Sequence, residues 1–470
     1  MAVRFVTPDH WTPWGEASAR LPDGREAIIW QGIPGERATV QPSGGGQHKV
    51  HGHWLAADHP HPLRREPPCG KVNPCGGCPL MHLVEEGQHR ARLAMMRAAF
   101  ALERVDIRVP DAVVPSPDGI EDYRHTVKMA CGRSPMGSTR LGAFGRGTHD
   151  VVPIPGCNVA TPLMRQLMNV VAHHTIDLKM WPWDPETGQG ALRYVVIRQS
   201  RASGKAIVTL VCGRGGRMPR QLAERIQQNH GQVAGVALHI NSLPGNAIYD
   251  SEPGEAPQFL ALAGNPILEE ELAGVRLRVG PGDFFQANPG MADRIATDLV
   301  DLLKPWRDRP VLDLYCGVGG FTLALGKAHG WAYGAEVVPG AIERAKENAL
   351  LNHISAEFGV GRVEDILPDL KRRTEGQGPV VMVDPARRGL EEGVIDAIAE
   401  LKPAALAYLS CNPRALARDL RLLLDRGWSV RELRAYDMFP QTAHLETLAL
   451  LQPPEAPSVT RRAPRRRIIR

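Results

Sequence analysis

The feature that most constrains the fold is an alternation of short apolar runs with helical patterns over residues 311–410. The strand-like runs occur in this order: Val311–Tyr315, Trp331–Glu336, Val380–Val383 and Ala404–Ser410. Strands separated by amphipathic helices pair in parallel, because each connecting helix packs back onto a face of the sheet. The sequence therefore predicts a doubly wound α/β sheet in the last third of the chain.

Two further apolar runs follow, at Trp428–Tyr436 and Leu445–Leu451. The link between them is too short for a crossover helix, so we expect them to complete the sheet as an antiparallel pair. Before the first strand, Met291–Leu303 repeats apolar residues at helical spacing and is followed by Pro305. We expect the domain built on this sheet to span residues 281–456.

The remaining sequence predicts two other domains, because 470 residues exceed the size of one compact core. Residues 1–60 place turn dipeptides between short β-rich runs, which is typical of a small OB-like barrel. Residues 61–280 predict an α+β domain. We expect it to hold a helix from His82 to about Arg104 and a hairpin of Tyr194–Gln199 with Ala206–Cys212.

The net charge of +5 is concentrated in the last ten residues, which begin at Arg461 and contain six arginines. A basic tail over residues 457–470 can bind phosphates, or be solvated without a function of its own. No apolar run is long enough to span a membrane, and the N-terminus lacks the pattern of a secretory signal. We therefore expect a cytoplasmic protein, in which eight cysteines favour metal ligation or catalysis over disulfides.

Reactive side chains stand where three of the predicted strands end. Cys411 follows one strand, Asp384 another, and Glu336 ends a third. Because the carboxyl ends of parallel strands share one edge of a sheet, these side chains are expected in one crevice. Cys411 there suits a nucleophile, the alternative being a small buried apolar residue, and Asp384 could instead cap a helix. Glu446 begins an apolar strand, where a carboxylate is costly unless it is partnered, functional or at a surface edge.

A glycine-rich turn follows the first strand of the sheet, in the block DLYCGVGG from Asp313. Gly317, Gly319 and Gly320 would let the backbone turn tightly and approach a nucleotide closely. Glu336 could then accept hydrogen bonds from both ribose hydroxyls. The G-x-G-x-x-G spacing is not met, so the pattern alone allows NAD, S-adenosylmethionine, or a tight turn that binds nothing.

Five ordered blocks make this sequence similar to the RNA uracil-C5 methyltransferases, which use S-adenosylmethionine. The blocks are FFQAN from Phe284, DLYCGVGGFTL from Asp313, DPARRG from Asp384, SCNP from Ser410, and DMFPQT from Asp437 with HLE from His444. The resemblance implies a Rossmann-like class I methyltransferase domain, an N-terminal TRAM-type RNA-binding barrel and a central domain that carries an iron–sulfur cluster. It also implies cofactor contacts from Gln286, Tyr315, Glu336 and Asp384.

The resemblance implies that Cys411 is the nucleophile and Glu446 the base. A thiolate that adds to C6 of uracil makes C5 nucleophilic, and a base must then remove the C5 proton. Three positions depart from the family pattern. Gly320 stands where many members have asparagine, Ala386 replaces a second proline, and Ala415 replaces a frequent threonine.

Three cysteines, Cys69, Cys75 and Cys78, lie in a loop rich in glycine and proline. Zinc and iron–sulfur clusters both require a fourth ligand. The resemblance supplies Cys157, as in family members with a [4Fe–4S] cluster, and zinc is the alternative. We expect Cys131 and Cys212 to be core residues and Cys316 to serve packing.

The expected partner is structured RNA, bound by a monomeric enzyme. The cysteines favour ribosomal RNA, and large-subunit RNA within that class, with transfer RNA as the rival substrate. Basic residues over Tyr123–Lys128 match a family segment near the substrate, although a solvated charged strand has the same composition. A small-molecule methyltransferase and a non-catalytic RNA-binding protein are the other hypotheses.

Overall fold

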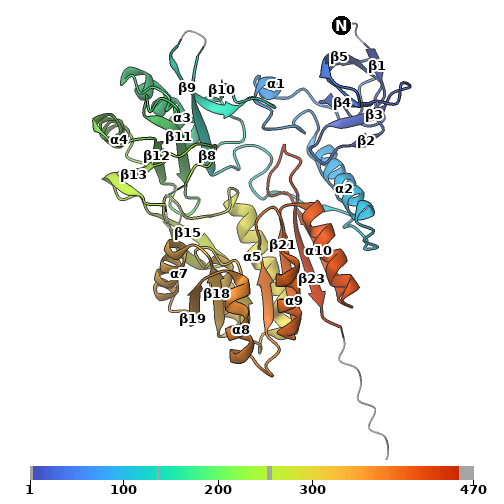
Figure 1. Ribbon diagram of the computed structural model, residues 1–470, viewed down its shortest axis with the longest axis vertical. Helices are drawn as coiled ribbons and strands as arrows, with labels where there is room; N and C mark the ends of the chain where they lie inside the picture. The colour runs from blue at the N-terminus through green and yellow to red at the C-terminus, as the bar shows by residue number, and fades with distance from the viewer. Residues whose placement is uncertain (1–3, 135–136, 251–256, 455–470) are drawn as a thin grey trace, which may run out of the picture.

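The computed structural model describes residues 4–134, 137–250 and 257–454, and places most of their strands in three sheets (Figure 1). The predicted basic tail and residues 455–456 lie outside the described residues. None of the described helices is long and apolar enough to cross a membrane.

The first sheet confirms the β unit expected near the N-terminus. Its order is β1-β5-β6-β4-β3-β2. The strands are β1 (Arg4–Val6), β2 (His10–Trp11), β3 (Ala17–Arg20), β4 (Glu26–Trp30), β5 (Ala38–Gly45) and β6 (Lys49–Ala57). Strands β4 and β6 pair in parallel, and the other pairs are antiparallel. Ile29, Ala38 and Val40 form its small buried core.

The middle of the chain forms a seven-stranded sheet of order β10-β9-β8-β11-β12-β13-β14. The strands are β8 (Thr126–Arg133), β9 (Thr139–Phe144), β10 (Val151–Pro153), β11 (Leu192–Gln199), β12 (Ala206–Cys212), β13 (Val233–Ile240) and β14 (Leu260–Gly264). The predicted hairpin is confirmed as β11 and β12. Helices α3 (Pro162–Asp177) and α4 (Arg217–Asn229) bury their apolar residues against it. The short helix α1 (Val72–Cys75) precedes this region.

The third sheet has the order β19-β18-β17-β20-β21-β23-β22-β7, and its first five strands are parallel. They are β17 (Val311–Asp313), β18 (Ala332–Glu336), β19 (Ala356–Val360), β20 (Val380–Val383) and β21 (Ala405–Ser410). Strands β22 (Ser429–Tyr436) and β23 (Glu446–Gln452) form the predicted antiparallel pair. The α/β prediction is therefore confirmed. The sequence reading missed β19.

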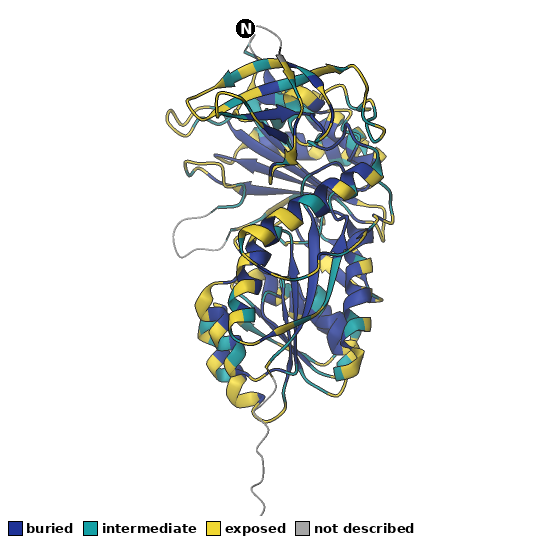
Figure 2. Cartoon of the chain, turned by 90° about the vertical axis from the view of Figure 1, so that its right-hand side faces the viewer, coloured by how far each residue is buried: buried dark blue, intermediate teal, exposed yellow. Residues whose placement is uncertain are grey.

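Helices cover both faces of this sheet, because alternate strand residues point to opposite sides. One core lies under α8 (Val363–Arg373), α9 (Glu392–Glu400) and α10 (Pro413–Asp425). The other lies under α5 (Pro289–Leu303), α6 (Gly320–His329), α7 (Pro339–Asn352) and the hairpin of β15 (Leu268–Leu272) and β16 (Val275–Val279). Figure 2 shows exposed residues on the outer sides of the helices and buried strands between them.

The segment before the middle sheet also joins the third sheet. Helix α2 (Glu85–Leu102) lies within three residues of its expected bounds and packs through Leu93, Met96 and Phe100 into the core under α10. Strand β7 (Val113–Val114) pairs with β22 at the sheet edge. Residues 85–114 thus contribute to the α/β unit, which no local pattern indicated. The division into domains at residues 60, 280 and 456 stays a prediction.

Candidate active site

The strand order reverses between β17 and β20, and several of the predicted site residues lie at this switch point. The glycine loop (residues 314–319) leaves β17 here and leads into α6. Gly317 and Gly319 have φ values of +51° and +87°, a region that side chains with a Cβ enter only at a cost. A Cβ at Gly320 would lie 3.0 Å from Leu272 Cδ2, so a larger side chain here would require Leu272 to shift.

Glu336 holds the glycine loop from the end of β18. Its Oε2 accepts a hydrogen bond from the Gly317 amide at 3.2 Å. Its Oε1 accepts from the amides of Val337 and Val338 at 2.7 and 3.1 Å. The carboxylate is therefore fixed beside the loop, at the position expected of a ribose ligand.

Asp313, the last residue of β17, is a site residue that the sequence reading did not single out. Its side chain is buried, Oδ2 accepts from Thr322 Oγ1 at 2.6 Å, and Oδ1 has no hydrogen-bond partner among the described residues. Burial raises the pKa of Asp313 to about 6. Its position at the end of a buried strand was the signal that could have identified it.

Asp384 and Gln286 meet across the switch point. Gln286 Nε2 donates to Asp384 Oδ2 at 3.5 Å. Burial, followed by the charge of Asp313, raises the pKa of Asp384 to about 7. Gln286 is held from the next turn, where Asn288 caps α5 through the Met291 amide and donates to Ser116 Oγ at 3.0 Å.

Cys411 lies half-buried between β21 and α10, as expected. Asn412 caps α10 through the Arg414 amide and donates to the Arg387 carbonyl at 2.8 Å, which ties this turn to the loop after Asp384. Burial, followed by the carboxylate of Glu446, raises the pKa of Cys411 to about 11, and the guanidinium of Arg387 opposes this shift. The thiol is therefore protonated near neutral pH in the ligand-free site.

Glu446 begins β23 and lies beside Cys411, because Thr447 and Ser410 are paired across the antiparallel strands. Its side chain is buried, and Oε1 has no hydrogen-bond partner among the described residues. Burial, followed by the charge of Asp384, raises the pKa of Glu446 well above its ordinary value. A buried carboxyl without a partner is costly and is found most often where chemistry needs it.

Arg387 adds a positive charge to this carboxylate-rich corner. Its Nη2 lies 3.3 Å from His444 Nε2, and burial, followed by this guanidinium, lowers the pKa of His444 to about 4. A neutral imidazole can accept the Arg387 hydrogen bond. Neither Arg387 nor His444 was predicted as a site residue from the sequence.

Four of the eight cysteines lie together, away from these groups in the sequence. Cys69, Cys78 and Cys157 pack against one apolar cluster that includes Val72 and Tyr123. Burial, together with the charges of Cys157 and Cys69, raises the pKa of Cys75. The structure thus brings the three thiols of the cysteine loop (residues 69–80) next to Cys157 from a distant turn.

The other cysteines behave as expected. Cys212 is buried within β12, and Cys131 packs against the same core. Cys316 is 7 % exposed, and burial raises the pKa of its thiol, so this cysteine is a poor nucleophile.

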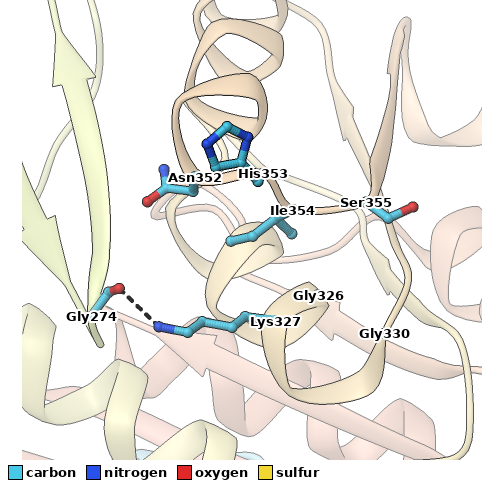
Figure 3. A pocket seen from close by; sticks show the side chains of 8 residues that line it. All are labelled: Gly274, Gly326, Lys327, Gly330, Asn352, His353, Ile354 and Ser355. Carbon is cyan, nitrogen blue, oxygen red and sulfur yellow. Dashed lines mark hydrogen bonds between the residues drawn. The ribbon is translucent and has the colours of Figure 1, made fainter.

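A hollow of about 370 Å³ lies on the opposite edge of the same sheet (Figure 3). The ends of α6 and α7 line it through Gly330 and His353, and Lys327 Nζ donates to the Gly274 carbonyl at 3.1 Å. Helix C-termini carry partial negative charge, which Lys327 already offsets. None of the predicted site residues lines it.

Comparison with known proteins decides the family. A relative from Geobacter sulfurreducens, described as an uncharacterized RNA methyltransferase, is 32 % identical over 91 % of this chain and 86 % of its own length. An uncharacterized RNA methyltransferase from Nostoc is 33 % identical over 91 % of each chain. Residues 361–453 match the family model for tRNA (uracil-5-)-methyltransferases. The chain belongs to the S-adenosylmethionine-dependent RNA uracil-C5 methyltransferase family.

This RNA methyltransferase also shares its fold with a solved structure. The tRNA (uracil-54, C5)-methyltransferase of Pyrococcus abyssi, in complex with S-adenosyl-L-homocysteine, superposes with a TM-score of 0.73 at 23 % identity. The match covers 95 % of this chain and 100 % of that one. The Rossmann-like methyltransferase fold expected from the sequence is thereby confirmed.

Proposed function

We propose that this enzyme methylates C5 of a uridine in RNA through a covalent bond between Cys411 and C6. The observation that carries the proposal is a thiol at the end of β21 beside a buried carboxyl at the start of β23, one oxygen of which has no hydrogen-bond partner among the described residues. The family assignment supports the reaction class, and the residue roles are the part we add.

The cofactor-holding residues fit the resemblance. Gln286, Asp384 and Glu336 line the switch point with the glycine loop, and we propose Tyr315, Gly317, Gly319 and Gly320 as further contacts. Asp313 and Asp384 place carboxylates where a sulfonium cation would be stabilised. S-adenosylmethionine, when bound, supplies an electrophilic methyl group for a nucleophilic carbon.

The chain's own residues provide the other steps. The Cys411 thiolate forms a bond to C6, and the electrons of the C5–C6 double bond move toward C5 and O4. After C5 is methylated, Glu446 takes the C5 proton. The C–H electron pair restores the double bond, the C6–S bond breaks and the thiolate leaves. Burial raises the pKa of Glu446, which makes its carboxylate a stronger proton acceptor than an exposed one.

The thiol must lose its proton before it attacks. Arg387 favours the thiolate, whereas Glu446 and Asp384 disfavour it. A proton on either carboxylate, or a cation bound beside them, removes negative charge from the neighbourhood and lowers the pKa of Cys411. We infer that the Cys411 thiol is deprotonated only when the cationic cofactor is bound beside these carboxylates.

The four cysteines fit a [4Fe–4S] cluster as the resident group, because Cys₄ is its usual ligand set. Zinc also accepts four thiolates, with sulfurs about 3.8 Å apart for Zn–S bonds of about 2.3 Å. The resemblance to cluster-bearing family members favours the cluster over zinc. Iron and sulfide analysis with an absorbance spectrum of anaerobically purified protein distinguishes them.

We propose structured RNA as the substrate and ribosomal RNA as the favoured class, on the basis of the four cysteines. The similarity to a tRNA methyltransferase makes transfer RNA the second candidate. The N-terminal sheet, which we propose to be a TRAM-type barrel, presents Trp14 at 70 % exposure. Its neighbour Gly15 lies against Ala443, three residues before Glu446. Exposed aromatic side chains are stacking platforms for RNA bases. We also propose a monomeric, cytoplasmic enzyme.

The test is incubation of the purified enzyme and labelled S-adenosylmethionine with unmodified ribosomal RNA and transfer RNA, separately, followed by nucleoside analysis. Labelled 5-methyluridine in the ribosomal pool supports the proposal, and label in the transfer RNA pool alone changes the substrate class. Absence of 5-methyluridine from both pools, with the cofactor bound, contradicts it.

A further inference from the structure

The carboxylate of Glu446, the proposed base, must be held in position by something other than its own hydrogen bonds. One of its oxygens has no hydrogen-bond partner among the described residues, so no side chain fixes that end of the carboxylate. Its place must therefore depend on the backbone that leads into β23. That backbone is the base loop, which we define as residues 437–446.

Gln441 lies at the middle of the base loop and is fully buried. Its φ of +71° is unusual for a residue other than glycine, and such a conformation persists only where the surroundings impose it. The amide of Gln441 donates to Gln88 Oε1 at 2.7 Å, and its carbonyl accepts from the Leu80 amide at 3.0 Å. Both backbone groups are thus held by residues far away in the sequence.

The side chain of Gln441 is held just as completely. Its Oε1 accepts from Gln88 Nε2 at 2.9 Å and from Arg65 Nη2 at 3.0 Å. Its Nε2 donates to the Ile120 carbonyl at 2.9 Å. No other side chain of the base loop joins so many separate segments among the described residues.

From Gln441 the path to the base is short. The His444 amide donates to Thr442 Oγ1 at 3.2 Å, and Ala443 packs against Leu80 and Leu83. Glu446 follows within five residues and is paired in the sheet from there on. A displacement of Gln441 is therefore expected to displace the Glu446 carboxylate as well.

We propose that Gln441 is a positioning residue for Glu446, and that it sets the rate of C5 proton removal while leaving nucleophilic attack by Cys411 intact. The proposal rests on the function proposed above. Cys411 is held by a different set of contacts, through Asn412 and the Arg387 carbonyl, so the two halves of the reaction can be separated.

The step affected is the elimination. If the base is displaced, the C5 proton stays in place, the C6–S bond cannot break, and the methylated RNA remains attached to Cys411. The variant Gln441→Ala removes the three side-chain hydrogen bonds and keeps a Cβ at the same φ. A denaturing gel with labelled, unmodified RNA and S-adenosylmethionine shows attached RNA as a band of higher mass.

We expect Gln441→Ala to release 5-methyluridine at least about tenfold more slowly than the wild type, and to accumulate the covalent complex. Its affinity for S-adenosylmethionine and its adduct formation with 5-fluorouridine RNA should stay within about twofold. Loss of turnover without accumulated complex would overturn the proposal, and so would slower adduct formation or wild-type kinetics.

Two further variants keep the test decisive. Gln88→Ala breaks the same contact from α2, and the double variant should be no worse than either single one if both act through that contact. If Gln441→Ala does not fold, Gln88→Ala must accumulate the complex for the proposal to stand. Asn241→Ala is the matched control, since Asn241 is an equally buried amide that links Arg193 to the Ala247 carbonyl in the middle sheet. It should trap no RNA.

The outcome separates this proposal from the proposed function. A wild-type enzyme that makes no 5-methyluridine in any RNA contradicts the function itself. A wild type that turns over normally, beside a Gln441→Ala variant that traps nothing, contradicts only the positioning role.

Discussion

The two residues that we propose as nucleophile and base are held by very different parts of the chain. The turn that carries Cys411 is tied through Asn412 to Arg387, 25 residues away. The base loop that carries Glu446 is tied through Gln441 to Arg65, 376 residues away, and through Asp437 to Arg92, 345 residues away. The nucleophile thus belongs to the methyltransferase fold, whereas the base is placed by the N-terminal quarter of the chain.

This difference teaches that residues 281–456, the predicted methyltransferase domain, do not make the complete site without α2 and β7. Asp437 is buried between Arg92 and His89 of α2, and its amide donates to the Val114 carbonyl in β7. Burial alone would raise the pKa of Asp437, but Arg92 and His89 hold it below its usual value. The carboxylate is therefore ionised at neutral pH and depends on α2 for its counter-charge.

The largest effect is expected at the nucleophile itself. Cys411→Ala should abolish 5-methyluridine formation, with a loss of at least about 10³-fold, because no other group can add to C6. S-adenosylmethionine binding should persist. Cys212→Ala is the control for loss of a buried thiol, and retention of the covalent complex by Cys411→Ala would contradict the assignment.

The next largest effect is expected at the ion pair between Arg92 of α2 and Asp437 of the base loop. Arg92→Met removes the partner of a fully buried carboxylate and should lower the free energy of unfolding by about 3–5 kcal/mol. Urea denaturation measures this change. Arg90→Met is the control, since its exposed pair with Glu86 on the same helix should contribute less than about 1 kcal/mol. Equal losses in the two variants would refute the special role of the buried pair.

The features near Cys411 could be predicted from the sequence, whereas most contacts that hold the base loop could not. Most strands of the α/β sheet, the glycine loop, Asp384 and Cys411 follow local patterns of apolar runs and strand ends, and they were predicted; β19, which lacks such a run, was not. The packing of α2, the pairing of β7 and the Gln88–Gln441 contact join segments more than 300 residues apart, which no periodicity encodes. Glu446 was identified through the resemblance, while the charge of its neighbour Arg387 could be assigned to the site only from the structure.

A third prediction concerns the protonation of the nucleophile. Asp384→Asn removes a negative charge that raises the pKa of Cys411, so the pKa should fall from about 11 and alkylation at pH 8–9 should become faster. Arg387→Gln removes the opposing positive charge and should slow alkylation. Iodoacetamide labelling of the Cys411 peptide over pH 7–10 measures both. Shifts of the same sign in the two variants would be inconsistent with this electrostatic account.

The smallest effect is expected from a single hydrogen bond to the base loop. Tyr123→Phe removes the donor to the Pro440 carbonyl, a contact of 2.9 Å, and should cost about 0.5–1.5 kcal/mol of stability. Turnover should fall a few-fold through slower elimination. Tyr194→Phe makes the same chemical change at the Asn246 carbonyl in the middle sheet and should leave elimination unchanged. A faster elimination in Tyr123→Phe would argue against a positioning contact.

The ion pair between Arg92 and Asp437 has a consequence for synthesis of the protein on the ribosome. The two residues are separated by 345 positions, and translation adds roughly 5–20 residues per second. Arg92 is therefore made roughly 20–70 seconds before Asp437, the buried acidic residue with which it forms its ion pair. Until Asp437 emerges, α2 cannot bury that guanidinium without a large desolvation penalty. The nascent chain can complete its first sheet early, but it must keep α2 undocked until nearly the last strand has been translated.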